Sequence, residues 1–163
     1  MTTKTTSRPI TILLVDDDPD CRMLVRDIIA MASARADVRE APGGREALAY
    51  LRRSRPGGPN PRPDLVYLDV EMPGMSGLDV LRALRAEPSL RDIPVVMLTG
   101  VDDPRARREA LDAGAGGYVL KPSEPRRFLN IVTASVRQCL ADRAGAAVRA
   151  AYGEHPGEDQ GDE

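Results

Sequence analysis

The stretch Ile10–Asp18, ITILLVDDD, decides the fold of this chain. Its first six residues are almost entirely aliphatic, as in a strand buried on both faces, and three aspartates end the run. Asp18 and Pro19 suit the N-cap and the first position of a helix. The segment therefore predicts a buried strand that turns directly into a helix over residues 19–34. The apolar residues that carry the helical spacing are Cys21, Leu24, Val25, Ile28 and Ile29.

Short apolar runs and helical patterns continue to alternate along the chain. Five strands and five helices predict an α/β fold with a parallel sheet covered on both faces. Right-handed crossovers favour a doubly wound, flavodoxin-like sheet with strand order 2-1-3-4-5, and the more polar second strand is expected at an edge. Beyond the first unit, strands are expected at 37–41, 64–68, 93–98 and 117–120, and helices at 44–54, 78–85, 104–113 and 125–140.

Composition indicates one soluble globular domain, since the 163 residues are 42% hydrophobic and 29% charged. We expect the domain to span residues 9–141, after a flexible start at 1–8. Residues 142–163 are expected to extend the last helix, over 144–151, and then to form a disordered acidic tail. The net charge of −2 argues against nucleic acid as a partner, and no apolar run is long enough for a membrane span or a signal peptide. A cytoplasmic location is the expectation.

Histidine and cysteine are too scarce for several kinds of site. His155 is the only histidine, and Cys21 and Cys139 lack metal-ligand spacing, which argues against zinc sites, Ser-His-Asp triads and Cys-His pairs. The two cysteines fall near opposite ends of helices in the expected fold, too far apart for a disulfide. Lys121 is conspicuous because only two of the 23 basic residues are lysine.

Candidate reactive residues follow the ends of the expected strands, namely Asp16–Asp18, Asp69, Thr99 and Lys121. In an open parallel sheet these ends meet at the edge where ligands bind. Crowded carboxylates repel one another unless a cation lies among them, and hard oxygen ligands suit Mg²⁺. An Asp carboxylate can attack a phosphoryl group while a metal ion and a lysine neutralise its oxygens. The residues therefore predict a Mg²⁺-dependent aspartyl-phosphate site.

Four motifs occur in order at these strand ends: ILLVDDD (12–18), DLVYLDVEMPGMSG (64–77), VVMLTG (95–100) and GYVLKP (117–122). Over roughly residues 9–140 the chain resembles the receiver domain of two-component response regulators. The resemblance implies that Asp69 is the phosphoacceptor. It also implies Mg²⁺ ligation by Asp17, Asp69 and the main-chain carbonyl of Glu71, with Asp16 acting through water.

The same resemblance assigns the remaining roles. Thr99 and Lys121 would bind the phosphoryl group, and the Lys121–Pro122 peptide is typically cis in the family. Thr99 and Tyr118 match the family's switch positions, with Tyr118 expected to rotate inward from a solvent-exposed position. A sensor histidine kinase or phosphotransfer protein would supply the phosphoryl group. A downstream protein or a second copy of the chain would bind the face formed by residues 104–140.

The expected function is that of a stand-alone, single-domain response regulator that signals through a phosphorylation-dependent surface, and two other functions are the alternatives. A phosphohydrolase of the haloacid dehalogenase type carries D-x-D after its first strand, whereas this chain has Asp69-Val70-Glu71 after its third. A degenerate receiver that only binds a partner would not need the complete residue set. Glu71 and Val101 depart from the commonest receiver pattern beside the phosphoryl group, and Val101 is expected to prolong the life of the phosphorylated form. The long loop at 52–63 does not identify a partner.

Overall fold

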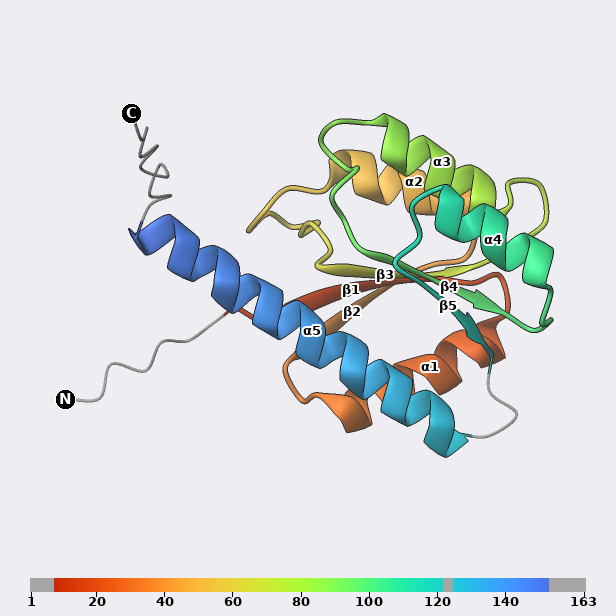
Figure 1. Ribbon diagram of the computed structural model, residues 1–163, viewed down its shortest axis with the longest axis horizontal. Helices are drawn as coiled ribbons and strands as arrows, with labels where there is room; N and C mark the ends of the chain where they lie inside the picture. Colours follow the sequence, from red (N-terminus) through yellow and green to blue (C-terminus); the bar gives the residue numbers. More distant parts are fainter. Residues whose placement is uncertain (1–7, 122–124, 153–163) are drawn as a thin grey trace, which may run out of the picture.

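The structure is a computed structural model that describes residues 8–121 and 125–152. Strands and helices alternate throughout this part of the chain (Figure 1). The elements are β1 (Ile10–Val15), α1 (Pro19–Ala32), β2 (Ala36–Ala41), α2 (Gly44–Arg53), β3 (Leu65–Asp69), α3 (Gly77–Ala86), β4 (Val95–Thr99), α4 (Pro104–Asp112), β5 (Gly117–Leu120) and α5 (Pro125–Tyr152).

The five strands form one parallel sheet in the order β2-β1-β3-β4-β5. The predicted fold class and strand order are therefore confirmed. All six residues of β1 are buried, whereas β2 is mostly half-buried, as expected of a central strand and an edge strand. This order places the carboxyl ends of β1 and β3 side by side, with β4 and β5 following.

Helices cover both faces of the sheet, with α2, α3 and α4 on one side and α1 and α5 on the other (Figure 1). The first layer buries Leu48, Leu81 and Ala110 against the sheet. The second buries Ile29 and Phe128. Successive residues of β1 point alternately into these two layers, which is why an almost unbroken aliphatic strand is needed at this position.

Side-chain caps start the helices that leave the carboxyl ends of β1 and β4. Asp18 accepts a hydrogen bond from the Asp20 amide at 2.9 Å, with Pro19 at the first helical position, as predicted. Asp103 caps α4 through the Arg105 amide at 3.0 Å. These caps satisfy amide groups that would otherwise lack partners, so each helix begins right after the loop at its strand end.

Several element ends differ from the predicted ones. β3 begins at Leu65 rather than residue 64, because the Asp64 side chain accepts a hydrogen bond from the Thr11 amide at 2.9 Å. β4 begins at Val95, since the Ile93 amide closes a turn onto the Leu90 carbonyl at 3.1 Å. Helix α5 runs to Tyr152, past the apolar stripe expected at 125–140 and through the segment 144–151 that was expected to extend it.

The limits proposed for the domain stay predictions. The flexible start, apart from Arg8, and the acidic segment 153–163 lie outside the described residues. The Lys121–Pro122 peptide, expected to be cis, includes a residue outside that part of the chain as well. Among the described helices, none combines the length and the hydropathy that a membrane crossing requires.

Candidate functional site

Three carboxylates meet at the carboxyl edge of the sheet. Asp16 follows the last residue of β1, Asp69 ends β3, and Asp17 begins the loop to α1. One carboxylate oxygen from each lies within 4.8 Å of the others. Asp16 and Asp69 are buried, at 0% and 2% exposure, while Asp17 is exposed. The pairing of β1 with β3 brings together residues that are more than fifty positions apart in the sequence.

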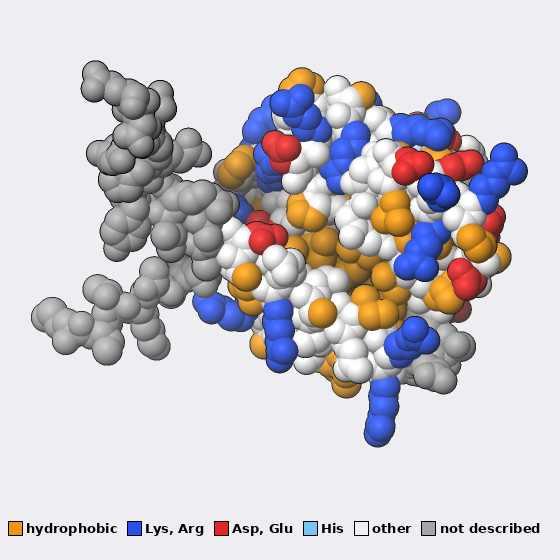
Figure 2. Space-filling model, in the orientation of Figure 1, with side chains coloured by type: hydrophobic (Ala, Val, Ile, Leu, Met, Phe, Trp, Pro, Cys, Tyr) orange, Lys and Arg blue, Asp and Glu red, His pale blue; other side chains and the backbone are white. Residues whose placement is uncertain are grey.

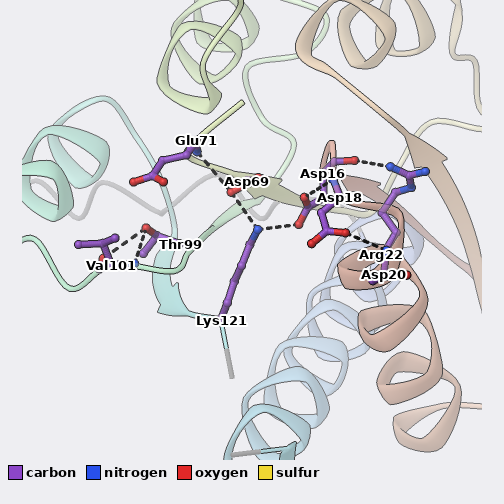
Figure 3. Close-up of polar contacts among 9 residues, drawn as sticks. All are labelled: Asp16, Asp18, Asp20, Arg22, Asp69, Glu71, Thr99, Val101 and Lys121. Atoms are coloured by element: carbon purple, nitrogen blue, oxygen red, sulfur yellow. Dashed lines mark hydrogen bonds and ion pairs between the residues drawn. The ribbon is translucent and has the colours of Figure 1, made fainter. Parts of the chain in front are cut away.

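Lys121 crosses from the end of β5 to these carboxylates (Figure 3). Its Nζ lies 2.8 Å from Asp16 Oδ2 and 3.2 Å from Asp69 Oδ1. The Lys121 amide donates to the Thr99 carbonyl, which extends the pairing of β5 with β4. The conspicuous lysine of the sequence is therefore the cation of the acidic cluster.

The electrostatic environment separates the two buried carboxylates. Burial and the neighbouring Asp16 carboxylate raise the pKa of Asp69 to about 6. Burial acts to raise the pKa of Asp16 as well, but hydrogen bonds from Cys21 and Lys121 hold it below its ordinary value. The two carboxylates in turn raise the pKa of Lys121, although its burial acts in the opposite direction. Asp16 thus stays ionised beside the charged Lys121. The surplus negative charge of the cluster instead raises the pKa of Asp69.

The loop around Asp69 depends on Gly77. A Cβ atom at Gly77 would lie 2.0 Å from the main-chain oxygen of Asp69, and the Gly77 amide donates to the Val70 carbonyl at 3.0 Å. Only a residue without a side chain allows α3 to begin this close to the end of β3.

The Glu71 amide donates to Asp69 Oδ1 at 3.3 Å, and the Glu71 side chain is exposed.

Thr99 ends β4 beside the cluster, but its hydroxyl is turned toward the next loop. It donates to the Val101 carbonyl and accepts from the Val101 amide, both at 3.2 Å (Figure 3). The Thr99 side chain is buried, with 1% exposure. A Cβ atom at Gly100 would meet no neighbouring atom, so the space around this position is open.

Tyr118 lies on the same face of the sheet as Thr99. It pairs with Met97 in the register of β4 and β5, two residues before the position opposite Thr99. Its side chain is half-buried against the core layer under α2, α3 and α4. The side chain lies between the expected solvent-exposed position and a fully inward one, so its rotation stays a prediction.

Two contacts to Asp16 were not predicted. Arg22 donates from Nη1 to the main-chain carbonyl of Asp16 at 2.6 Å, and the Cys21 thiol lies close enough to the Asp16 carboxylate to lower its pKa. Burial and Asp16 raise the pKa of Cys21 to about 12, so this thiol remains protonated. Both residues lie in the first turns of the predicted helix, but the pattern there does not show which side chains point back toward the strand end. Cys139 is buried near the Asp64 carbonyl, and both sulfurs are thiols, as predicted.

Comparison with known proteins defines the class. The family model described as response regulator receiver domain matches residues 12–133, and the chain belongs to this family. It contains a receiver domain of two-component signalling, a phosphoacceptor signalling domain, as the motifs indicated.

Particular relatives include longer proteins. The chain is 36% identical over 119 residues to the cyclic di-GMP phosphodiesterase response regulator RpfG of Xanthomonas campestris, covering 73% of this chain and 30% of that protein. It is 37% identical over 127 residues to the DNA-binding response regulator MtrA of Mycolicibacterium smegmatis, covering 78% of this chain and 50% of that protein. The chain therefore spans half or less of the length of these relatives.

The chain matches one solved structure over nearly the whole length of that structure. The phosphorylated cyanobacterial phytochrome response regulator RcpA superposes with a TM-score of 0.72 at 28% sequence identity. The match covers 82% of this chain and 96% of that one.

Proposed function

We propose that Asp69 accepts a phosphoryl group from a phosphohistidine and that the chain transmits this event through a protein-binding surface. The observation that carries the proposal is the buried Asp69 carboxylate, held within 4.8 Å of the Asp16 and Asp17 carboxylates and 3.2 Å from Lys121. Three acidic groups against one lysine leave a surplus of negative charge, which suits a divalent cation.

The carboxylates fit Mg²⁺, because they offer hard oxygen donors from two strand ends that lie close together. We assign its direct ligands to Asp17, Asp69 and the main-chain carbonyl of Glu71, with Asp16 acting through water. When bound, Mg²⁺ neutralises charge on the oxygens of a transferring phosphoryl group.

In the proposed step, a carboxylate oxygen of Asp69 attacks phosphorus and an O–P bond forms. The P–N bond to the donor histidine breaks, and its electron pair returns to the imidazole nitrogen. Lys121 then binds a phosphoryl oxygen in place of the Asp69 carboxylate. The Thr99 hydroxyl breaks its hydrogen bond with the Val101 carbonyl and donates to a second phosphoryl oxygen. This exchange is favourable because a hydrogen bond to a charged acceptor is stronger than one to a neutral carbonyl.

The partner that supplies the phosphoryl group is a sensor histidine kinase or a phosphotransfer protein. The similarity to the response regulator RcpA supports phosphorylation-dependent signalling by this chain, and we propose that it acts as a stand-alone regulator. MtrA and RpfG are named for activities in DNA binding and cyclic di-GMP hydrolysis, and neither activity is proposed for this chain. Its near-neutral charge supports a partner other than nucleic acid, and we retain a cytoplasmic location as part of the proposal.

For output, we propose the face formed by residues 104–140. Leu111 of α4 and Leu120 of β5 are each 46% exposed on it. The side of the molecule on which α4, β5 and α5 lie shows hydrophobic side chains near its middle and basic side chains around them (Figure 2). Movement of Thr99 toward the phosphoryl group would leave room for Tyr118 to pack more deeply, and this would change the surface that a protein partner or a second copy binds.

The test is phosphorylation of the full chain with acetyl phosphate. We expect an acid-stable, base-labile adduct that forms with Mg²⁺ and is absent in EDTA and in Asp69→Ala. An adduct that persists in Asp69→Ala would refute the assignment, and no adduct on the wild type with Mg²⁺ would favour a degenerate receiver. A phosphatase of the haloacid dehalogenase type would instead turn over the reagent catalytically.

The switch has its own test, which is nuclear magnetic resonance with the phosphoryl mimic beryllofluoride. We expect chemical-shift changes at Thr99 and Tyr118 and across residues 104–140. Changes confined to the acidic cluster would contradict the proposed output face.

A further inference from the structure

Arg22, which is not one of the acidic residues, binds the main chain of Asp16. From the first turns of α1, its Nη1 donates to the carbonyl oxygen of Asp16 at 2.6 Å (Figure 3). The Asp16 amide in turn donates to the Ala41 carbonyl of β2 at 3.2 Å. Both main-chain polar groups of Asp16 are therefore occupied at the point where the chain leaves the sheet.

The Arg22 side chain is itself held by an acidic residue of the edge strand. Its Nε lies 3.4 Å from Glu40 Oε1, while the other oxygen of Glu40 lies 2.9 Å from Arg26 Nη1. The Arg22 side chain is 19% exposed and that of Arg26 is 54% exposed. Arg22 and Arg26 thus share one carboxylate and one helix, but only Arg22 reaches Asp16.

We infer that Arg22 is a positioning residue for the metal site, an inference that rests on the proposed function. The carbonyl of Asp16 belongs to the peptide unit that joins Asp16 to Asp17. Because that unit is planar, holding the carbonyl oxygen also fixes the direction in which Asp17 leaves the strand. The Asp17 side chain is exposed, so the main chain determines where its carboxylate lies relative to Asp16 and Asp69.

Charge and positioning predict opposite effects for the loss of Arg22. A guanidinium group beside a cation site repels the incoming ion, so its removal alone would strengthen Mg²⁺ binding. If Arg22 orients the Asp16–Asp17 peptide, its removal weakens binding, because groups that orient metal ligands contribute about tenfold or more to metal affinity. The sign of the change therefore separates the two effects.

The experiment is a Mg²⁺ titration of the full chain, followed by calorimetry and by amide chemical shifts. We expect Arg22→Met to weaken Mg²⁺ binding about tenfold. Arg26→Met is the matched control, since it removes the other arginine bound to Glu40 and leaves the contact with Asp16 intact. Arg22→Lys keeps a donor for the carbonyl and is expected to recover part of the affinity. Without metal, the amide signals of Asp17 and Asp18 are expected to shift in Arg22→Met and not in Arg26→Met.

Unchanged or tighter Mg²⁺ binding by Arg22→Met overturns the inference, as does an equal loss in Arg26→Met. If Arg22→Met does not fold, Glu40→Gln provides the second test, because it weakens the support of Arg22 without removing it and is expected to reduce affinity several-fold. A wild-type chain that binds no Mg²⁺ and forms no adduct at Asp69 refutes the proposed function as well. A wild type that does both, beside an unaltered Arg22→Met, refutes the positioning role alone.

Discussion

Lys121 Nζ lies 2.8 Å from the Oδ2 atom of Asp16, a carboxylate with no exposed surface. This contact joins the ends of β5 and β1, which are separated in the sheet by β3 and β4. It also explains why the pKa values of the two buried carboxylates shift in opposite directions. Asp16 has the lysine and the Asp18 amide as close partners, which lower its pKa, whereas burial and the Asp16 charge raise the pKa of Asp69.

Stability of the metal-free protein should depend on pH through Asp69. Its pKa of about 6 in the fold lies above the ordinary 3.8, so between these values the folded chain binds a proton that the unfolded chain does not. The free energy of unfolding therefore falls as pH rises through this interval. Asp69→Asn removes the ionisation, and above pH 7 we expect it to be more stable than the wild type by about 1–3 kcal/mol. Urea unfolding in EDTA from pH 4 to 8 measures this difference, and a pH-independent difference would contradict it.

Substitutions of Asp16 and of Asp17 should have different effects on the free energy of unfolding and on Mg²⁺ binding. Asp17→Asn is expected to leave the stability of the metal-free protein nearly unchanged, because its side chain is exposed, and to weaken Mg²⁺ binding strongly. Asp16→Asn leaves Lys121 with a weaker partner and should lower the free energy of unfolding by about 1–3 kcal/mol. Asp17→Ala should weaken Mg²⁺ binding more than Asp16→Ala does. Thermal unfolding with and without Mg²⁺ gives both quantities, and equal profiles for the two positions would be the contrary result.

Gly77→Ala should be costly where Gly100→Ala is not. The added Cβ at position 77 meets the Asp69 carbonyl oxygen, whereas at position 100 it enters open space. We expect Gly77→Ala to lower the free energy of unfolding by about 1–3 kcal/mol or more, and to displace Asp69 enough to weaken Mg²⁺ binding. Gly100→Ala should fall within about 0.5 kcal/mol of the wild type. Chemical denaturation distinguishes the two, and comparable losses would show that the close approach of α3 to β3 is not required.

The hydroxyl group of Tyr67 should be dispensable. This ring is fully buried in β3, and its oxygen makes no hydrogen bond of good geometry among the described residues, because the nearby Ser135 hydroxyl donates to the Ile131 carbonyl instead. Burial raises the pKa of Tyr67 to about 12, so the group is neutral. Tyr67→Phe is expected to keep or raise the free energy of unfolding, by up to about 1–3 kcal/mol, since it removes an unsatisfied polar atom. Tyr67→Ala, the control for the ring, should cost about 3–5 kcal/mol. A marked loss in Tyr67→Phe would mean that the hydroxyl is bonded.

Val101 should prolong the phosphorylated state. Its side chain is 52% exposed, and its contact with Thr99 is made by the main chain, so a substitution changes the side chain alone. Hydrolysis needs a water molecule in line with the Asp69 phosphoryl bond, which valine cannot hold by a hydrogen bond. Val101→Asn is expected to speed decay of the adduct about threefold to tenfold, equivalent to about 1 kcal/mol of barrier. Val101→Leu is the apolar control. Equal decay rates in wild type and Val101→Asn would assign the lifetime to other neighbours, with Glu71 the first to be tested.

The residues at the strand ends could be predicted from local pattern, and the strand order from the right-handed crossovers that join parallel strands. ITILLV is apolar on both faces, so it is a central strand, and the Asp residues after it fall at the ligand-binding edge of any parallel sheet. The motifs then indicated which family uses that set. Element ends were less predictable, since the start of β3 depends on where the Asp64 side chain hydrogen bonds.

The sequence by itself determined the class of fold and the chemistry available at its edge, because hydrophobic periodicity and parallel topology are properties of the chain order. Only the tertiary structure decided which atoms meet. The reach of Lys121 to Asp16 and the hydrogen bonds of Thr99 with Val101 depend on side-chain directions and on distances across neighbouring strands. The hold of Arg22 on the Asp16 carbonyl depends on how α1 packs beside β2, where Glu40 fixes the guanidinium group. No periodicity encodes these contacts, since they arise when separate segments pack together.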